Sequence, residues 1–263
     1  MTEFRCDPGN LCEGHYCCDG NSTKPALSIG DYIRLADHEG KKPSEVWREK
    51  GTVSLTRVSA LPPGYLMVTK GLLHEPCPYL KDGCEVYEVR PMGCASFPSF
   101  MFLRGRDESL NGTYKDLGCL QNVEYTEEQL RVPRQLDAIL CREVDMDGAL
   151  FWGGIPPVIN AATPAEIFGL AEQAADVAEK RDPHGQDVRT EMLLGAVRKA
   201  RVLFDSGQMT GGLDHDVFTS TLSPIVFTLF GEPIAQRMDA LGNSVLNKYR
   251  AHQTELEEVL KGM

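Results

Sequence analysis

The stretch from Cys77 to Cys94 reads CPYLKDGCEVYEVRPMGC and carries three cysteines within eighteen residues. It belongs to a wider pattern, because eight of the nine cysteines lie in the first 119 residues and the ninth is Cys141. Buried thiols that act as small hydrophobes would scatter along the chain instead. The clustering therefore predicts a site that binds through cysteine sulfur. The eight clustered cysteines are Cys6, Cys12, Cys17, Cys18, Cys77, Cys84, Cys94 and Cys119.

Composition narrows the kind of site. The 263 residues carry a net charge of −11, which disfavours binding to a nucleic-acid backbone. The N-terminus lacks the apolar region of a signal peptide, and no window has the roughly 18–20 apolar residues of a membrane helix. We therefore expect a cytoplasmic protein with no membrane association. In a reducing compartment a cysteine cluster indicates metal binding or catalysis rather than disulfides.

Thiolate is the ligand that zinc and iron–sulfur clusters prefer, and eight thiolates divide into two four-ligand sites. Structural zinc sites use cysteines with two to four residues between them, and only the interval from Cys12 to Cys17 has that length. The spacing therefore favours iron–sulfur, as one or two [4Fe-4S] clusters, and zinc stays the alternative. His15 and His74 are expected to be hydrogen-bond donors or surface residues rather than ligands. Cys141 is expected to be a separate buried thiol in a helix.

Several short motifs accompany the cysteines. They are Cys17-Cys18, Leu27-Ser28-x2-Asp31-x2-Arg34-Leu35-Ala36, Cys77-Pro78-Tyr79-Leu80, Gly83-Cys84-x2-Tyr87-Glu88-x-Arg90-Pro91-x2-Cys94 and Phe97-Pro98. Over about residues 4–120 this combination resembles the YkgJ-type "CxxCxxCC" cysteine-cluster family of zinc- or iron-chelating proteins and iron–sulfur oxidoreductases. The resemblance implies metal ligation by the cysteines. The chain departs from the family in its wider first cysteine spacing and in Ala95, where the family often has a basic residue.

One branch of that family is the flagellin lysine N-methylase, so the resemblance also implies S-adenosylmethionine as a candidate co-substrate. The chain has neither a Rossmann glycine fingerprint nor the cysteine motif of radical enzymes. Three functions stay open. The chain is a redox protein with a cluster, a cluster-dependent modifying enzyme with a small-molecule or protein substrate, or a zinc-stapled interaction module without catalysis.

Four other side chains are candidates for a role beside the cysteines. Arg90 lies between two cysteines and either donates hydrogen bonds to cluster sulfur or substrate, or forms a surface salt bridge with Glu85 or Glu88. Asp31 and Arg34 lie one helical turn apart, which predicts an intrahelical ion pair. Tyr87 is expected to pack in the core.

The predicted fold is α+β and mostly helical. An irregular, cysteine-rich metal-binding domain over residues 1–150, with a small antiparallel sheet, precedes a helical domain over residues 160–263. The boundary is placed at the Gly- and Pro-rich stretch 153–157. In the first domain, helices are predicted from Ser28 and from Ser44. Strands are predicted at 65–69 and 85–89, with a hairpin formed by 97–104 and 113–117.

Helical patterns dominate the rest of the chain. One helix is expected from Thr126 to about Val144, and another begins where Thr163 precedes Pro164, an N-cap followed by Pro at the first helical position. Apolar residues at steps of three and four predict a final long helix from Ile234 to Val259. Its apolar stripe either packs within the chain or forms a homodimer.

Overall fold

The computed structural model describes residues 26–57, 65–74, 76–81, 83–96, 126–128, 130–150, 158–161, 163–206 and 215–261. Helices predominate, and three strands form one sheet. In chain order the elements are α1 (Ile29–Glu39), α2 (Pro43–Lys50), β1 (Gly51–Arg57), β2 (Tyr65–Leu73), the 3-10 helix η1 (Tyr87–Val89), α3 (Met92–Ser96), α6 (Arg131–Leu150), β3 (Val158–Asn160), α7 (Pro164–Arg181), α8 (Val188–Asp205), α9 (His215–Asp239) and α10 (Asn243–Lys261).

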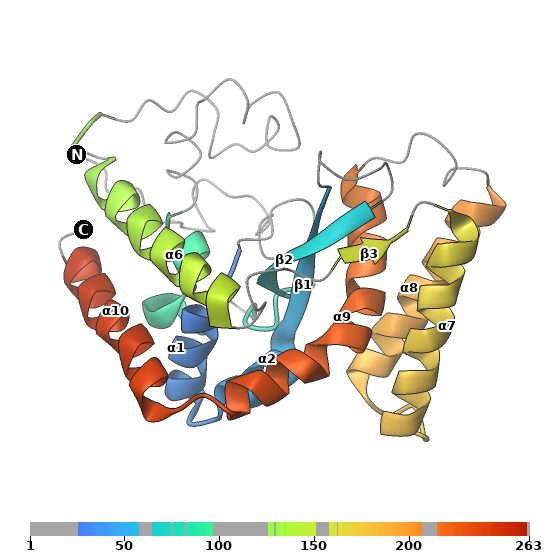
Figure 1. Cartoon of the computed structure of the whole chain (residues 1–263). Helices are drawn as coiled ribbons and strands as arrows, with labels where there is room; N and C mark the ends of the chain where they lie inside the picture. Colours follow the sequence, from blue (N-terminus) through green and yellow to red (C-terminus); the bar gives the residue numbers. More distant parts are fainter. Residues whose placement is uncertain are drawn as a thin grey trace.

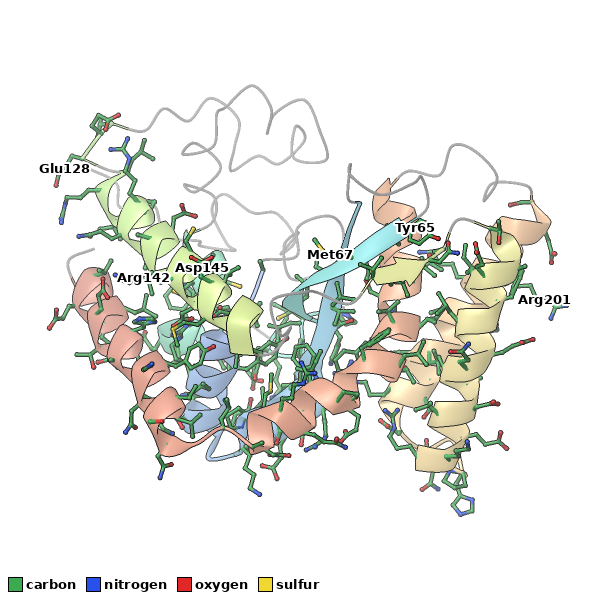
Figure 2. All side chains as sticks on the ribbon, in the orientation of Figure 1. Tyr65, Met67, Glu128, Arg142, Asp145 and Arg201 are labelled. Atoms are coloured by element: carbon green, nitrogen blue, oxygen red, sulfur yellow. The ribbon has the colours of Figure 1, made fainter. Side chains whose placement is uncertain are left out.

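The sheet is antiparallel, with β2 between β1 and β3. Tyr65 and Met67, at the start of β2, pair with Asn160 and Val158 of β3 (Figure 2). Leu27 adds an isolated bridge to β2 on the way into α1. The predicted strand 65–69 is confirmed as part of β2. The mostly helical α+β class is likewise confirmed, whereas the predicted hairpin of 97–104 and 113–117 lies outside the described residues.

Three aromatic rings form the centre of the main core. Trp47 of α2 is buried, and its indole N–H donates to the carbonyl of Gly231 in α9 at 2.8 Å. Its ring centroid lies 5.0 Å from that of Tyr32 in α1 and 5.2 Å from that of Phe227 in α9. The core therefore joins elements from both predicted domains. The predicted boundary at 153–157 lies outside the described residues, and the division into two domains stays a prediction.

A second, smaller core cluster lies at one end of the molecule. It contains Met92 and Ala95 of α3, Val132, Leu136 and Ile139 of α6, and Leu256 of α10. Figure 1 shows α6 and α10 beside α1 at this end, with α7 and α8 at the opposite end beyond α9. The short helix α3 is thus packed against two long helices, although it has only five residues of its own.

Two predicted helix starts agree with the structure, whereas the helix expected from Thr126 to about Val144 begins at Arg131 and ends at Leu150. Ser28 caps α1 through a reciprocal capping box with Asp31, and Thr163 caps α7 in the same way with Glu166. The helix expected from Ser44 begins one residue earlier, at Pro43. No helix within the described residues is long and apolar enough to cross a membrane.

Two predicted elements are wrong. Residues 85–89 form turns and the 3-10 helix η1 rather than a strand, because their backbone hydrogen bonds close locally: the N–H of Tyr87 donates to Cys84 and that of Val89 to Val86. The predicted final helix is two helices, α9 and α10, separated at residues 240–242. Four residues of its apolar stripe (Ile234, Met238, Tyr249 and Leu256) are buried within the chain. This is the first of the two predicted uses of the stripe, and the homodimer stays a prediction.

Candidate functional site

Three of the eight predicted ligands lie in the part of the chain that the structure describes. Cys77 and Cys84 flank a short loop after β2, Cys94 lies in α3, and all three are half-buried. The other five (Cys6, Cys12, Cys17, Cys18 and Cys119) lie outside the described residues. Among the described residues, no group of three or more His, Cys, Asp or Glu side chains is arranged to hold a metal ion.

The loop between Cys77 and Cys84 folds back on itself through backbone hydrogen bonds. The N–H of Leu80 donates to the carbonyl of Cys77 at 3.0 Å, and the N–H of Glu85 donates to the carbonyl of Tyr79, also at 3.0 Å. Leu80 and Cys84 form an isolated antiparallel bridge. This closure brings the two cysteines near enough that the charge of Cys77 acts on the Cys84 thiol.

Tyr79 anchors this loop to the frame of the molecule. Its ring is buried, its hydroxyl donates to the Glu39 carboxylate at the end of α1, and the Lys50 ammonium lies 4.0 Å from its ring centroid. Lys50 also donates to Glu39 at 2.8 Å. Burial and the Glu39 charge raise the pKa of the Tyr79 hydroxyl, so the phenol stays protonated as the donor.

Opposing effects act on the pKa of the Cys84 thiol. Burial raises the pKa of its thiol, and the charge of Cys77 acts in the same direction. A hydrogen bond from the backbone N–H of Val86 and the positive charge of Arg90 both lower the pKa and stabilise the thiolate. The Val86 N–H and the charge of Arg90 would thus favour the thiolate, which is the form that binds metal.

Cys94 is positioned through the start of its helix. The backbone N–H of Met92 donates to Oδ1 of Asp31 at 3.0 Å, so a carboxylate of α1 holds the first residue of α3. Ala95 is buried in the second core cluster. A basic residue at position 95 would put an uncompensated charge into an apolar contact, which is a physical reason for the alanine there.

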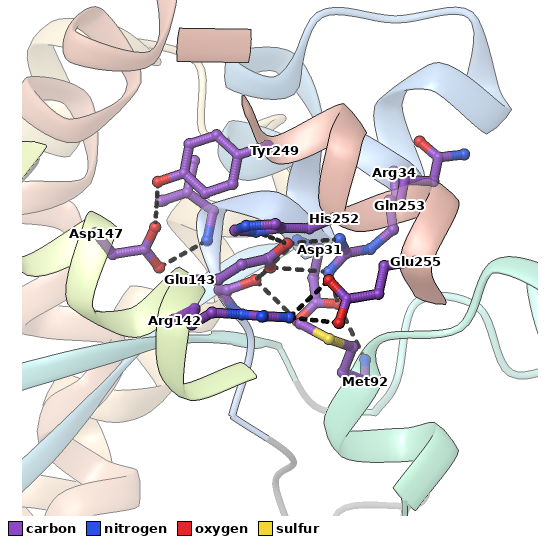
Figure 3. A network of polar contacts seen from close by, with 12 residues as sticks. Asp31, Arg34, Met92, Arg142, Glu143, Asp147, Tyr249, His252, Gln253 and Glu255 are labelled. Atoms are coloured by element: carbon purple, nitrogen blue, oxygen red, sulfur yellow. Dashed lines mark hydrogen bonds and ion pairs between the residues drawn. The ribbon is translucent and has the colours of Figure 1, made fainter. Parts of the chain in front are cut away.

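Asp31 belongs to a buried network of charged side chains (Figure 3). Its carboxylate pairs with Arg34 at 2.7 Å, as predicted for these two residues. Arg34 also donates to the two oxygens of Glu143 in α6, at 2.9 and 3.0 Å, and the Ser28 hydroxyl donates to Glu143 as well. Burial alone would lower the pKa of Arg34, but the charges of Asp31 and Glu143 outweigh it and raise the pKa, so the guanidinium stays charged.

One turn further along α6, Asp147 extends this network. It accepts hydrogen bonds from the backbone N–H of Ile29 at 2.8 Å and from the Tyr249 hydroxyl at 2.6 Å. Burial, together with the charges of Glu143 and Asp31, raises the pKa of Asp147 to about 7. His252 of α10 completes the group, with Nδ1 3.5 Å from Glu143. The network therefore ties α1, α6 and α10 together behind the helix that carries Cys94.

Glu143, Asp147 and Tyr249 were not predicted as members of any site. The signal lay in α6, where the residues facing the core follow one another at steps of three and four: Val132, Leu136, Ile139, Glu143 and Asp147. Two acids that continue an apolar stripe are unusual, because carboxylates are rarely buried without partners. Such a pattern indicates a partner cation on a neighbouring helix.

Arg90 makes neither of the salt bridges considered for it among the described residues. Glu85 pairs with Lys81 instead, and the Arg90 guanidinium lies 3.9 Å from the ring centroid of Tyr87. Tyr87 is half-buried and supports this stacking rather than filling the core. The prediction for Cys141 is wrong: it is exposed on α6, because it lies beside the buried face of that helix and not on it.

The chain was compared with protein families, curated proteins and solved structures. No family model, no curated protein and no solved structure matches the chain. The resemblance to the YkgJ-type family therefore stays a prediction that rests on the motifs themselves.

Proposed function

We propose that this chain is an iron–sulfur protein that holds one or two [4Fe-4S] clusters through its eight N-terminal cysteines and acts in redox or cluster-dependent modification chemistry. The ligands would be Cys77, Cys84 and Cys94 together with Cys6, Cys12, Cys17, Cys18 and Cys119.

The observation that carries the proposal is the clustering of eight of the nine cysteines in the first 119 residues, and at one of them, Cys84, the sulfur accepts a hydrogen bond from the backbone N–H of Val86. An amide two residues after a cysteine that donates to its sulfur stabilises the thiolate, which is the form that binds metal. Hydrogen bonds to ligand sulfur also tune the reduction potential of iron–sulfur clusters. The donor belongs to the backbone, so it is present with any residue at position 86 except proline.

The hydrogen bonds that attach the described ligand segments to α1 also support the proposal. The loop with Cys77 and Cys84 is anchored by Tyr79 on Glu39, and the helix with Cys94 is anchored by Met92 on Asp31. Both anchors belong to α1, so one rigid helix sets the positions of two ligand segments. Metal sites depend on such supporting contacts to orient their ligands.

The cluster, when bound, supplies one-electron transfer. The chain's own residues supply soft ligands, an amide donor at Cys84 and a cation at Arg90. The negative surface, with a net charge of −11, suits a partner or substrate that is neutral or positive and disfavours nucleic acid.

The first test is anaerobic purification, followed by an absorption spectrum and assays of iron, zinc and sulfide. A broad visible band with matched iron and sulfide is expected. A colourless protein that holds stoichiometric zinc, also after anaerobic reconstitution with iron and sulfide, would overturn the proposal and favour a zinc-stapled interaction module.

Single substitutions make the test specific. Cys84→Ser and Cys94→Ser are each expected to lower the iron and sulfide content, because each removes a thiolate ligand from a position that the fold holds in place. Cys141→Ser is the matched control, since Cys141 is exposed and lies outside the cluster. Equal metal content in all three variants would contradict the assignment of the ligands.

A further inference from the structure

The guanidinium of Arg90 has buried N–H donors that lack hydrogen-bond acceptors among the described residues. Its Nε and Nη1 atoms are buried and have no hydrogen-bond partner in the part of the chain that the structure describes, and the guanidinium stacks on Tyr87. Buried guanidinium groups normally donate all their hydrogen bonds, and an exception requires an explanation. Stacking on a ring uses the face of the guanidinium and leaves the N–H groups at its edge available.

The nearby acidic side chains do not provide that explanation. Glu85 pairs with Lys81, and Glu88 is exposed. Arg90 instead stacks on Tyr87, whose backbone N–H donates to the carbonyl of Cys84 at 3.3 Å. The guanidinium therefore lies at the turn that begins with Cys84.

We infer that Arg90 is a positioning residue of the metal centre, whose Nε–H and Nη1–H donate hydrogen bonds to a sulfur atom of the bound cluster beside Cys84. This inference rests on the proposed function. The unpaired N–H groups would find their acceptors when the cluster binds, and Tyr87 holds the guanidinium plane in the orientation that this requires. A cation that donates to cluster sulfur favours the reduced, more negative form and raises the reduction potential.

The test is a redox titration of the purified, cluster-loaded full chain and of Arg90→Gln, Arg90→Lys and Arg90→Met. Arg90→Gln and Arg90→Met are expected to lower the ratio of reduced to oxidised cluster about ten-fold at a given potential, which is a shift of about 59 mV for a one-electron couple. Arg90→Lys keeps the charge but not the paired donors, so its potential is expected between those of Arg90→Gln and the wild type. Arg134→Gln, which removes a cation exposed at the start of α6, is the matched control and is expected to leave the potential unchanged.

A second measurement covers the case in which a variant does not retain its cluster. In the metal-free chain the Arg90 N–H groups have no described acceptor, so Arg90→Met is expected to unfold at the same urea concentration as the wild type or a higher one. In the loaded chain the same variant is expected to lose its cluster faster. Equal destabilisation of the loaded and metal-free forms would mean that Arg90 acts only through its stacking, which overturns the inference.

The two proposals fail in different ways. A wild-type chain that holds no iron and sulfide after reconstitution overturns the proposed function, and the role of Arg90 with it. A wild-type chain that holds its cluster, with the same potential and the same retention in Arg90→Gln and Arg90→Met, overturns the role of Arg90 alone.

Discussion

The carboxylate of Asp31 accepts a hydrogen bond from the backbone N–H of Met92 at 3.0 Å, and the same carboxylate pairs with Arg34 at 2.7 Å. A buried ion pair within α1 is thereby connected to the first residue of the helix that carries Cys94. A shift of this carboxylate would move the start of α3. The network behind the cysteines therefore supports the candidate site as well as the fold.

Asp31→Asn is expected to lower the free energy of unfolding by about 3 kcal/mol. The substitution removes one charge from a buried pair, and its amide group then faces the Arg34 guanidinium. Urea unfolding measures the loss. The control is Asp37→Asn in the same helix, whose exposed pair with Arg250 should contribute less than about 1 kcal/mol. Equal losses in the two variants would show that burial does not strengthen the contribution of Asp31.

Gly30→Ala is expected to destabilise the chain although alanine favours helices. A Cβ atom at position 30 would overlap the carboxylate of Glu143, which is fixed by Arg34 and Ser28. Separation of α1 from α6, or loss of those hydrogen bonds, should lower the free energy of unfolding by about 2–3 kcal/mol.

The matched substitution is Gly169→Ala in α7, where a Cβ would meet nothing within 4 Å. There the better helix propensity of alanine should raise the free energy of unfolding by up to about 1 kcal/mol. Opposite signs at positions 30 and 169 are the expected result in urea unfolding. A gain in stability at position 30 would mean that α6 can move away without loss.

The parts of the fold that could be predicted from the sequence are those with local causes. The box of Ser28 and Asp31 and the pair of Thr163 and Pro164 mark helix starts, because the hydrogen bonds involved lie within four residues. The segment EVYEV at 85–89 shows the limit of this reasoning. It alternates like a strand, yet it has no partner strand in the described structure and closes on itself.

Long-range causes explain the other differences. The stripe from Ile234 to Val259 passes through Leu241 with unbroken spacing, so the break after Asp239 cannot be seen in the apolar pattern. Likewise β1 was not predicted, because it has only two buried apolar residues, Val53 and Leu55, and its strand character depends on pairing with β2. The burial of Glu143 depends on Arg34, which lies 109 residues away in the chain.

Trp47→Ala is expected to lower the stability of the whole described fold by about 3–5 kcal/mol, since it removes a buried indole that joins α1, α2 and α9. Far-UV circular dichroism in urea should show one transition, displaced as a unit to lower urea. Val202→Ala, at an exposed position of α8, is the control and should change stability by less than about 0.5 kcal/mol. Two transitions, of which only one moves, would instead support independent domains at 1–150 and 160–263.

The pKa of Asp147, raised to about 7 by burial, predicts a pH dependence of stability. The ordinary pKa of an aspartate in an unfolded chain is about 3.9, so between about pH 4 and pH 7 the folded chain binds more protons than the unfolded one. The contribution of Asp147 is fully present below pH 4 and is lost as the pH rises through 7. The slope from this group is at most about 1.4 kcal/mol per pH unit.

Asp147→Asn should remove that slope and still fold. Its amide oxygen can accept the N–H of Ile29, and its NH2 group can donate to the Tyr249 hydroxyl, which accepts as well as donates. Relative to the wild type, the variant should therefore gain stability from about pH 4 to about pH 7 and level off above that. The measurement is urea unfolding at each pH with the metal content held equal.

Glu143, Asp31 and His252 face the same site and are present in both proteins, so the two proteins are compared at each pH. Asp145→Asn, on the exposed side of α6, is the control and should run parallel to the wild type. If Asp147→Asn also runs parallel, Asp147 is ionised in the folded chain throughout this range. The buried network would then hold three carboxylates against the Arg34 guanidinium, so Asp147→Asn should be more stable than the wild type by the same amount at every pH.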